Sequence, residues 1–167
     1  MPQVRFEEGY MDDVDRIRIG FMLPDFRLQD SSGQEVRLSD FWEKKNFAIF
    51  FLDDYLCKVC NNFLSNLQNG FQKMAGLDAV VLTISIDHPR FLGKLKQKLN
   101  LEFFLLYDQN SVVTKLYGLL NTQSPKGAPH PTVFVADKDR VIRYKKVNMG
   151  HKNSLQVEEI IESLKRL

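Results

Sequence analysis

The chain has 167 residues, a mass of 19.4 kDa and two cysteines, and 44% of its residues are hydrophobic while 26% are charged. This composition is typical of one globular domain and excludes a disordered chain or a disulfide-stapled scaffold. Because lysine and arginine exceed the acids by only two (23 − 21 = +2), we expect neither a nucleic-acid partner nor a membrane partner.

The N-terminal part of the sequence gives expectations about organisation and location. Residues 1–17 hold five acids and little periodicity, so we interpret them as a lead-in to a single domain over 18–167. No window reaches the roughly 18 consecutive apolar residues of a membrane span. The first residues also lack the apolar stretch of a secretory signal. We therefore expect a cytoplasmic protein, noting that a signal already removed would leave no trace.

Alternating and continuous apolar runs predict the strands of this domain. They are expected at 25–30, 34–38, 47–52, 80–86, 103–106, 132–136 and 141–145. The first two strands and the last two strands each form a predicted hairpin. The runs at 47–52 and 80–86 are apolar throughout, which is typical of strands covered on both faces. The short run at 103–106 is expected at a sheet edge.

Apolar residues at helical spacing predict the helices. They are expected at 63–74, 91–99, 112–117 and 155–167. In the second of these, Lys94, Lys96 and Lys98 are interpreted as a solvated helix face. The order of elements predicts an α/β fold: a central mixed sheet with helices on both faces and a β-hairpin at its N-terminal end.

Cys57 and Cys60 follow the first buried strand and open the first helix. Backbone N–H groups and the dipole at a helix N-terminus favour an anion, so Cys57 is expected to be a thiolate. Lys58 places a further cation beside it. Two intervening residues bring the second sulfur close enough for a reversible disulfide. We therefore predict that Cys57 attacks a disulfide and that Cys60 resolves the mixed disulfide.

Two other interpretations of the cysteine pair stay open. Cys57 and Cys60 could be half of a structural zinc site, which needs two more ligands, or they could be inert core residues. The histidines do not stand at a ligand-pair spacing; they are His88, His130 and His151. A copper site built from Cys57, Cys60 and His130 is a further alternative. We expect no bound metal and no cofactor.

His130, Pro131 and Thr132 lead into the strand at 132–136 and form the second signal. A proline before a strand is commonly only its first residue. A cis peptide bond at Pro131 would instead bring backbone polar groups up to a partner's chain. Beside a cysteine pair, we interpret these three residues as candidate substrate-binding residues.

Several blocks of the sequence resemble the alkyl hydroperoxide reductase/thiol-specific antioxidant family of the thioredoxin-like superfamily. The resemblance covers about residues 20–147, and the blocks that carry it are Gly20-x-x-Leu23-Pro24-Asp25-Phe26, 36–41, 81–87, 103–108, Tyr117-Gly118 and 131–137. It implies a thioredoxin-like fold, with the strand after Pro131 similar to the strand that follows the cis-proline of that fold.

The cysteine region departs from the peroxidase pattern of this family, Pro-x-x-x-Thr/Ser-x-x-Cys with an arginine from a later strand. Cys60 falls on the peroxidatic cysteine, but Asp53 stands at the proline position and Cys57 at the threonine position. The arginine would fall near Pro131 and is absent. The resemblance therefore leaves a peroxidase with Cys60 as peroxidatic and Cys57 as resolving cysteine as the alternative function.

The thioredoxin pattern keeps Cys57, Cys60 and Pro131. It lacks the usual buried aspartate, because Phe51 stands at that position, and Asp53 or Asp54 is the candidate replacement as proton acceptor. This resemblance implies a thiol–disulfide oxidoreductase in redox homeostasis. Its expected partners are a protein or small-molecule disulfide, with peroxide as the alternative substrate, and a thiol electron donor whose identity the sequence does not give.

Overall fold

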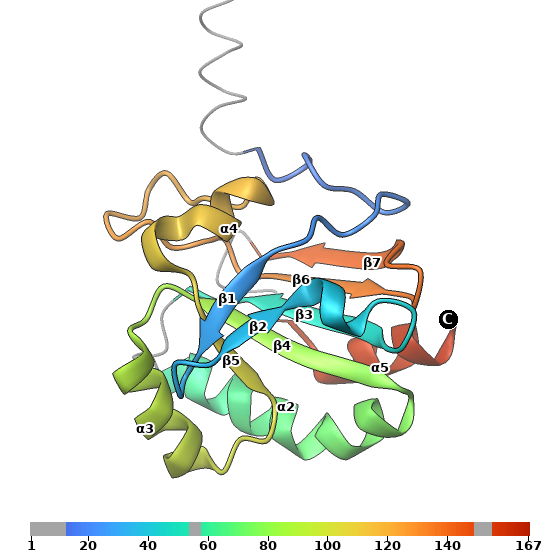
Figure 1. Cartoon of the computed structure of the whole chain (residues 1–167), viewed down its shortest axis with the longest axis horizontal. Coiled ribbons are helices and arrows are strands. Elements are labelled where there is room, and N and C mark those ends of the chain that lie inside the picture. The colour runs from blue at the N-terminus through green and yellow to red at the C-terminus, as the bar shows by residue number, and fades with distance from the viewer. Residues whose placement is uncertain (1–12, 54–57, 149–154) are drawn as a thin grey trace, which may run out of the picture.

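The computed structural model describes residues 13–53, 58–148 and 155–167, with 58–60 described as backbone only. These residues form one sheet packed between helices (Figure 1). The strands are β1 (Arg27–Asp30), β2 (Glu35–Arg37), β3 (Asn46–Phe51), β4 (Ala79–Ser85), β5 (Phe104–Tyr107), β6 (Thr132–Ala136) and β7 (Ile142–Val147). The helices are α2 (Lys58–Gly76), α3 (Pro89–Leu99), α4 (Val112–Leu116) and α5 (Val157–Lys165), with short 3-10 turns η1 (Leu38–Phe41) and η2 (Gln109–Ser111).

The sheet is mixed, as the sequence predicts. Its strand order is β2-β1-β5-β4-β3-β6-β7. β3, β4 and β5 run parallel, whereas β6 pairs antiparallel with β3 and with β7. β4 is buried along its whole length, and β3 is buried at every residue after its first. Side chains on both faces of these strands are therefore shielded, which explains why their sequences are apolar runs without alternation.

The prediction that the strand at 103–106 lies at a sheet edge is wrong. The N-terminal hairpin continues the sheet beyond β5, because Gln29 pairs with Tyr107 and Asp30 with Leu106 in antiparallel register. Leu105 and Leu106, on opposite faces of β5, are both fully buried. A short strand length alone does not reveal which neighbour a strand acquires from a distant part of the chain.

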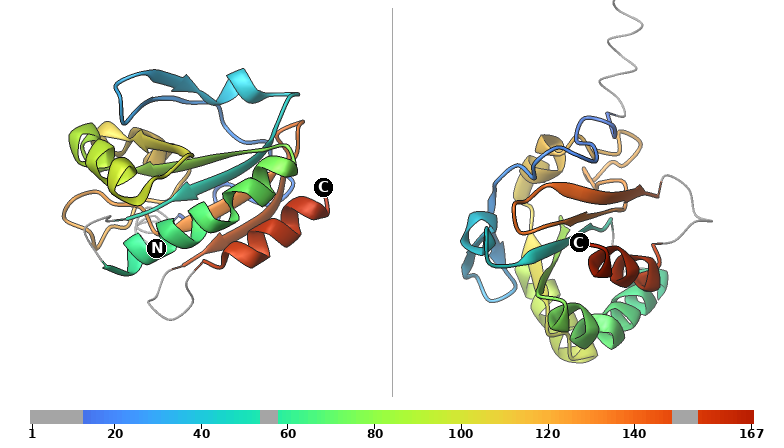
Figure 2. Two further views of the ribbon diagram at one scale, coloured as in Figure 1. Left: turned by 90° about the horizontal axis from the view of Figure 1, so that it is seen from below. Right: turned by 90° about the vertical axis from the view of Figure 1, so that its right-hand side faces the viewer.

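Helices cover both faces of the sheet, and two apolar clusters result. On one face α2, α3 and α5 pack against β-strand residues such as Phe50 and Val81. Figure 2 shows α2 and α5 lying side by side on this face. On the other face α4, η1 and the segment before β1 cover residues such as Phe47 and Ile84. None of the helices in the described part of the chain is long and apolar enough to cross a membrane.

The described end of the N-terminal segment lies against β7. Lys145 Nζ donates hydrogen bonds to the carbonyl oxygens of Val14 and Ile17, the latter at 2.6 Å. The Ile17 side chain is buried in the cluster beneath α4. Arg16 Nη1 donates to the Lys115 carbonyl oxygen at 2.8 Å, so this segment also contacts α4. The acidic lead-in is thus tied to the sheet over its last residues.

Candidate active site

The candidate site lies where the carboxyl ends of β3 and β4 meet. This border of the sheet, which runs across the strand ends and not along an outer strand, is called the sheet edge below. Phe51, the last residue of β3, pairs with Ile84 of β4 and with Thr132, the first residue of β6. The chain leaving β3, the chain leaving β4 and the chain entering β6 therefore converge. In Figure 1 this edge is on the left, where α3 begins. Such an edge is the usual ligand-binding position of an open α/β sheet.

Helix α2 follows this edge along the chain, and the cysteine motif leads into it. Helix α2 begins at Lys58, and its first turn contains Cys60 and no acidic residue. Cys57 and Asp54 lie outside the described residues, and the structure does not describe the side chains of Lys58 and Cys60. A helix N-terminus carries unpaired N–H groups and roughly half a positive charge, which stabilise a nearby thiolate. Because the first turn holds no carboxylate, that partial charge is not offset from within the helix.

The peptide bond before Pro131 is trans, because no peptide bond in the described residues is cis. The sequence leaves the cis and trans forms of this bond open, and the structure has the trans form. The chain is extended here: Pro129 forms a β-bridge with Leu120, and His130 N–H donates to the Leu119 carbonyl oxygen at 2.8 Å before β6 begins. A trans bond, the form of most X–Pro bonds, suits this extended course.

The backbone around Pro131 has its hydrogen-bonding partners within the chain. Asn148 N–H donates to the Pro131 carbonyl oxygen at 2.7 Å, and Thr132 Oγ1 donates to the His130 carbonyl oxygen at 2.9 Å. Thr132 is fully buried, His130 is nearly so and Pro131 is partly exposed. Substrate binding by these residues stays a prediction. Of the three residues, Pro131 is the most exposed, so it is the one that a substrate would contact.

A pocket of about 240 Å³ opens at the same sheet edge. It is lined by Asp53, Ile86, Asp87, Asn121, Ser124, Pro125, Lys126 and Ala128. The structure thus brings the predicted Asp53 together with residues that follow β4 and with a loop before β6. The loop residues are not predictable as site residues, because Ser124-Pro125-Lys126 carries only turn signals. The pocket wall combines two carboxylates with one ammonium group.

The loop that forms one wall of this pocket is fixed at its base. Asn121 N–H donates to the Ala128 carbonyl oxygen at 3.0 Å, which closes the loop. Ser111 Oγ donates to the Gly127 carbonyl oxygen at 2.5 Å. Gly127 has φ +80°, and a Cβ there would lie 2.7 Å from Ser111 Oγ. This position therefore requires glycine both for its backbone conformation and for the close approach.

The metal alternatives find no support in the described residues. Within 13–53, 58–148 and 155–167, no group of three histidine, cysteine or acidic side chains is placed to hold a metal ion. The copper set of Cys57, Cys60 and His130 includes two thiols that the structure does not describe. His88 has a structural role, since its Nδ1 accepts the Arg90 N–H at 3.1 Å and caps α3.

Known proteins similar to this chain are thiol-dependent redox enzymes. Peroxiredoxin Bcp of Bacillus subtilis is 28% identical over 89% of this chain and 96% of its own length. Thiol-disulfide oxidoreductase ResA of Geobacillus thermodenitrificans is also 28% identical, over 94% of this chain and 84% of its own. The chain is thus a thiol-based oxidoreductase. It is equally similar in sequence to the peroxiredoxin and to the thiol-disulfide oxidoreductase.

The fold agrees with solved structures of the same kind. Peroxidoxin BcpB from Mycobacterium tuberculosis superposes with a TM-score of 0.81 and 21% identity, over 91% of this chain and 99% of that one. A peroxiredoxin-like protein from Aquifex aeolicus gives a TM-score of 0.78 at 16% identity, over 90% and 87% of the two chains. The model of the AhpC/TSA family matches residues 19–145. The chain, with its thioredoxin-like fold, therefore belongs to the AhpC/TSA family.

Proposed function

We propose that this protein is a thiol–disulfide oxidoreductase in which Cys57 is the attacking and Cys60 the resolving thiol. The observation that carries the proposal is the position of the cysteine motif at the N-terminal end of α2, which is described from Lys58 on and has no acid in its first described turn. The helix N-terminus stabilises a thiolate at the residue that precedes it. Cys60 follows three residues later in the same motif, and we assign it the resolving role.

The reaction balances without a cofactor. The Cys57 thiolate attacks one sulfur of a substrate disulfide, which forms a mixed disulfide and releases the other half as a thiolate. Cys60 loses its proton and attacks the Cys57 sulfur, which releases the second half and leaves a Cys57–Cys60 disulfide. Two electrons pass to the substrate. An external dithiol then reduces the Cys57–Cys60 disulfide and completes the cycle.

The composition of the site supports disulfide exchange over peroxide reduction. The family's peroxidase arginine would fall near Pro131, and the described residues at the start of β6 carry no guanidinium. The neighbouring pocket presents the carboxylates of Asp53 and Asp87 beside the ammonium group of Lys126. A site for the anionic transition state of peroxide cleavage needs concentrated positive charge, which this wall does not provide.

Trapping experiments test the assignment of roles. The substrate is a peptide whose cysteine is joined to a 2-thiopyridyl group in a mixed disulfide. Attack on the peptide sulfur releases the thiopyridyl group as an uncharged chromophore. Cys60→Ser should accumulate a stable peptide adduct on Cys57, since the resolving step is lost. Cys57→Ser should form adducts only at the rate of a free thiol. An adduct that forms rapidly on Cys60 in the Cys57→Ser protein would refute the assignment.

The similarity to peroxiredoxin Bcp favours one second candidate, a thiol peroxidase that uses the same residues in exchanged roles. Cys60 would attack a peroxide, become a sulfenic acid and release an alcohol or water, after which Cys57 would displace water and form the disulfide. The test is thiol loss in the reduced protein with one equivalent of hydrogen peroxide. A rate near that of a thiol peroxidase establishes this candidate, and a rate near that of a free thiol removes it.

A further inference from the structure

Three exposed cations form a stripe along α3, which we call the basic stripe: Arg90, Lys94 and Lys98. They stand at i, i+4 and i+8, so they share one helix face and extend over about 12 Å along the helix axis. No acid lies within α3. Among the residues that the structure describes, these three side chains take part in no ion pair.

Lys96 does not belong to this stripe, which corrects the interpretation of 94, 96 and 98 as one solvated face. Lys96 Nζ donates to the Phe103 carbonyl oxygen at 2.6 Å and is half-buried. Burial lowers the pKa of Lys96, and the nearby Asp30 carboxylate partly opposes that effect. The charge of Lys96 is therefore used within the fold, and the basic stripe is what α3 presents to other molecules.

The orientation of the basic stripe is fixed by the opposite face of α3. Leu92 and Leu95 are buried in the core, and a cap at each end holds the helix: His88 at its start and Asn100, in the left-handed conformation, at its end. The helix cannot rotate its charges away from solvent without exposing both leucines. Exposing buried apolar side chains is unfavourable, so the stripe stays on the solvent side of the helix.

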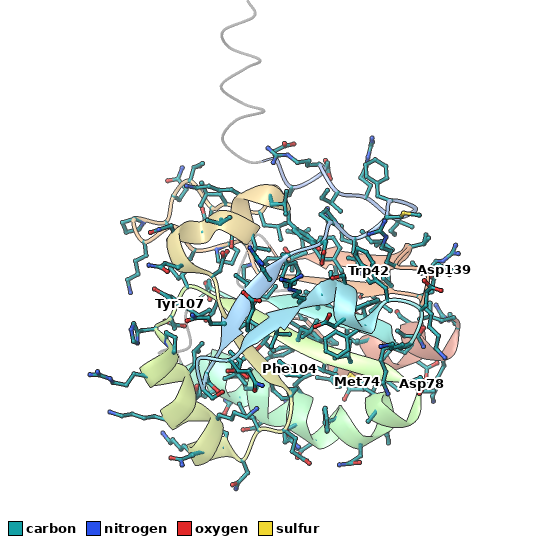
Figure 3. The ribbon with its side chains drawn as sticks, viewed as in Figure 1. Trp42, Met74, Asp78, Phe104, Tyr107 and Asp139 are labelled. Atoms are coloured by element: carbon teal, nitrogen blue, oxygen red, sulfur yellow. The ribbon has the colours of Figure 1, made fainter. Side chains whose placement is uncertain are left out.

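The basic stripe begins at the candidate active site. Asp87 lines the pocket at the sheet edge, and Arg90 follows it by three residues. Figure 3 shows Tyr107, whose ring lies 5.8 Å from that of His88, at this end of the molecule, whereas Asp78 and Asp139 lie at the opposite end. A molecule bound along the stripe would therefore have one end beside the pocket at the sheet edge.

We infer that the basic stripe guides an acidic protein partner to the cysteine pair, a partner whose own redox cysteines are flanked by carboxylates. The inference rests on the proposed function and specifies the class of partner. A row of cations on a convex helix matches a surface rather than a small ion, and the chain's net charge of only +2 is too low for general nucleic-acid binding. Complementary charge raises the association rate, and this rate enhancement decreases as salt is added.

The test compares three synthetic 2-thiopyridyl disulfide peptides that differ only in the residues beside their cysteine: glutamates, glutamines or lysines. The second-order rate constant of each is measured with the full chain, from about 0.01 M to about 1 M ionic strength, a range that shortens the Debye length from roughly 30 Å to roughly 3 Å. The variant is Lys94→Glu/Lys98→Glu. The matched control is Lys44→Glu/Lys73→Glu, which changes two exposed lysines away from the sheet edge by the same total charge.

We expect the glutamate peptide to react about tenfold faster than the glutamine peptide at low salt and equally fast at high salt. Lys94→Glu/Lys98→Glu should lose this advantage, and the control pair should keep most of it. Equal low-salt rates for the glutamate and glutamine peptides would overturn the inference. So would an equal loss of the glutamate peptide's rate advantage in both double variants. Binding of duplex DNA that depends on Lys94 and Lys98, without discrimination between peptides, would overturn it too. Failure of the glutamine peptide to react above a free thiol's rate would instead count against the proposed function.

Discussion

The Asp108 carboxylate is the most connected buried charge in the described residues, and its removal should destabilise the fold by a calculable amount. Asp108 is fully buried after β5. Its Oδ1 accepts the Val113 N–H at 2.9 Å, and its Oδ2 accepts the Thr114 N–H at 2.8 Å and the Thr114 hydroxyl at 2.7 Å. Ser111, which precedes α4, gives no side-chain cap. Asp108 therefore supplies the cap of α4 from a distance.

The hydrogen bonds set the magnitude of the expected effects. An unsatisfied buried donor costs about 1–3 kcal/mol. Asp108→Ala leaves three donors without an acceptor, so we expect a loss of about 4 kcal/mol in the free energy of unfolding. Asp108→Asn keeps one acceptor oxygen and should lose roughly 2 kcal/mol. Thr114→Val removes only the hydroxyl bond and should lose about 1 kcal/mol.

Urea unfolding of these variants and of the Asp108→Ala/Thr114→Val double variant tests the reasoning. Because Thr114 Oγ1 bonds to the group that Asp108→Ala deletes, the double variant should lose little more than Asp108→Ala alone. Additive losses would show that the two side chains act independently. A loss below about 1 kcal/mol for Asp108→Ala would show that water satisfies the freed donors. It would refute the claim that unsatisfied hydrogen-bond donors set the loss in stability.

Two further predictions concern a close backbone contact and an ionisable side chain. Gly118 has φ +73°, and a Cβ there would clash with the Asp13 carbonyl oxygen. Gly118→Ala should therefore lower the free energy of unfolding, measured by thermal unfolding, by at least about 2 kcal/mol. The control Gly76→Ala, where a Cβ would meet nothing within 4 Å, should be neutral or slightly stabilising. Burial, helped by the hydrogen bond from Tyr144 Oη to Glu159, raises the pKa of Tyr144 to about 12. The unfolded chain loses this proton first as pH rises above 10, so the free energy of unfolding should fall between about 10 and about 12, and less steeply in Tyr144→Phe.

Local patterns were sufficient to predict most elements of the fold. The uninterrupted apolar runs at β3 and β4 and the alternating runs of the N-terminal hairpin each occupy only a few consecutive residues. The position of β5 inside the sheet was not predictable in this way. It depends on pairing between Gln29 and Tyr107, which are far apart in the chain.

The candidate site also has a part that local sequence predicts and a part that depends on distant contacts. The cysteine pair near the start of a helix is predicted from local sequence, and α2 is described from Lys58 on. The pocket wall around Lys126 depends on a loop that packs against Ser111, and the isomer of the bond before Pro131 is not written in the neighbouring residues. The inward course of Lys96 depends on the Phe103 carbonyl oxygen, a partner that helical spacing does not disclose.

The most direct test of the central claim is the pH dependence of alkylation at each cysteine of the reduced wild-type chain. Lys58 lies between Cys57 and Cys60, so tryptic cleavage after it places each cysteine on its own peptide for mass spectrometry. If Cys57 is the attacking thiol, it should alkylate with the lower apparent pKa and stay reactive well below the usual thiol value of about 8.5. A lower apparent pKa at Cys60 would contradict the account and assign the nucleophile to the peroxidatic position.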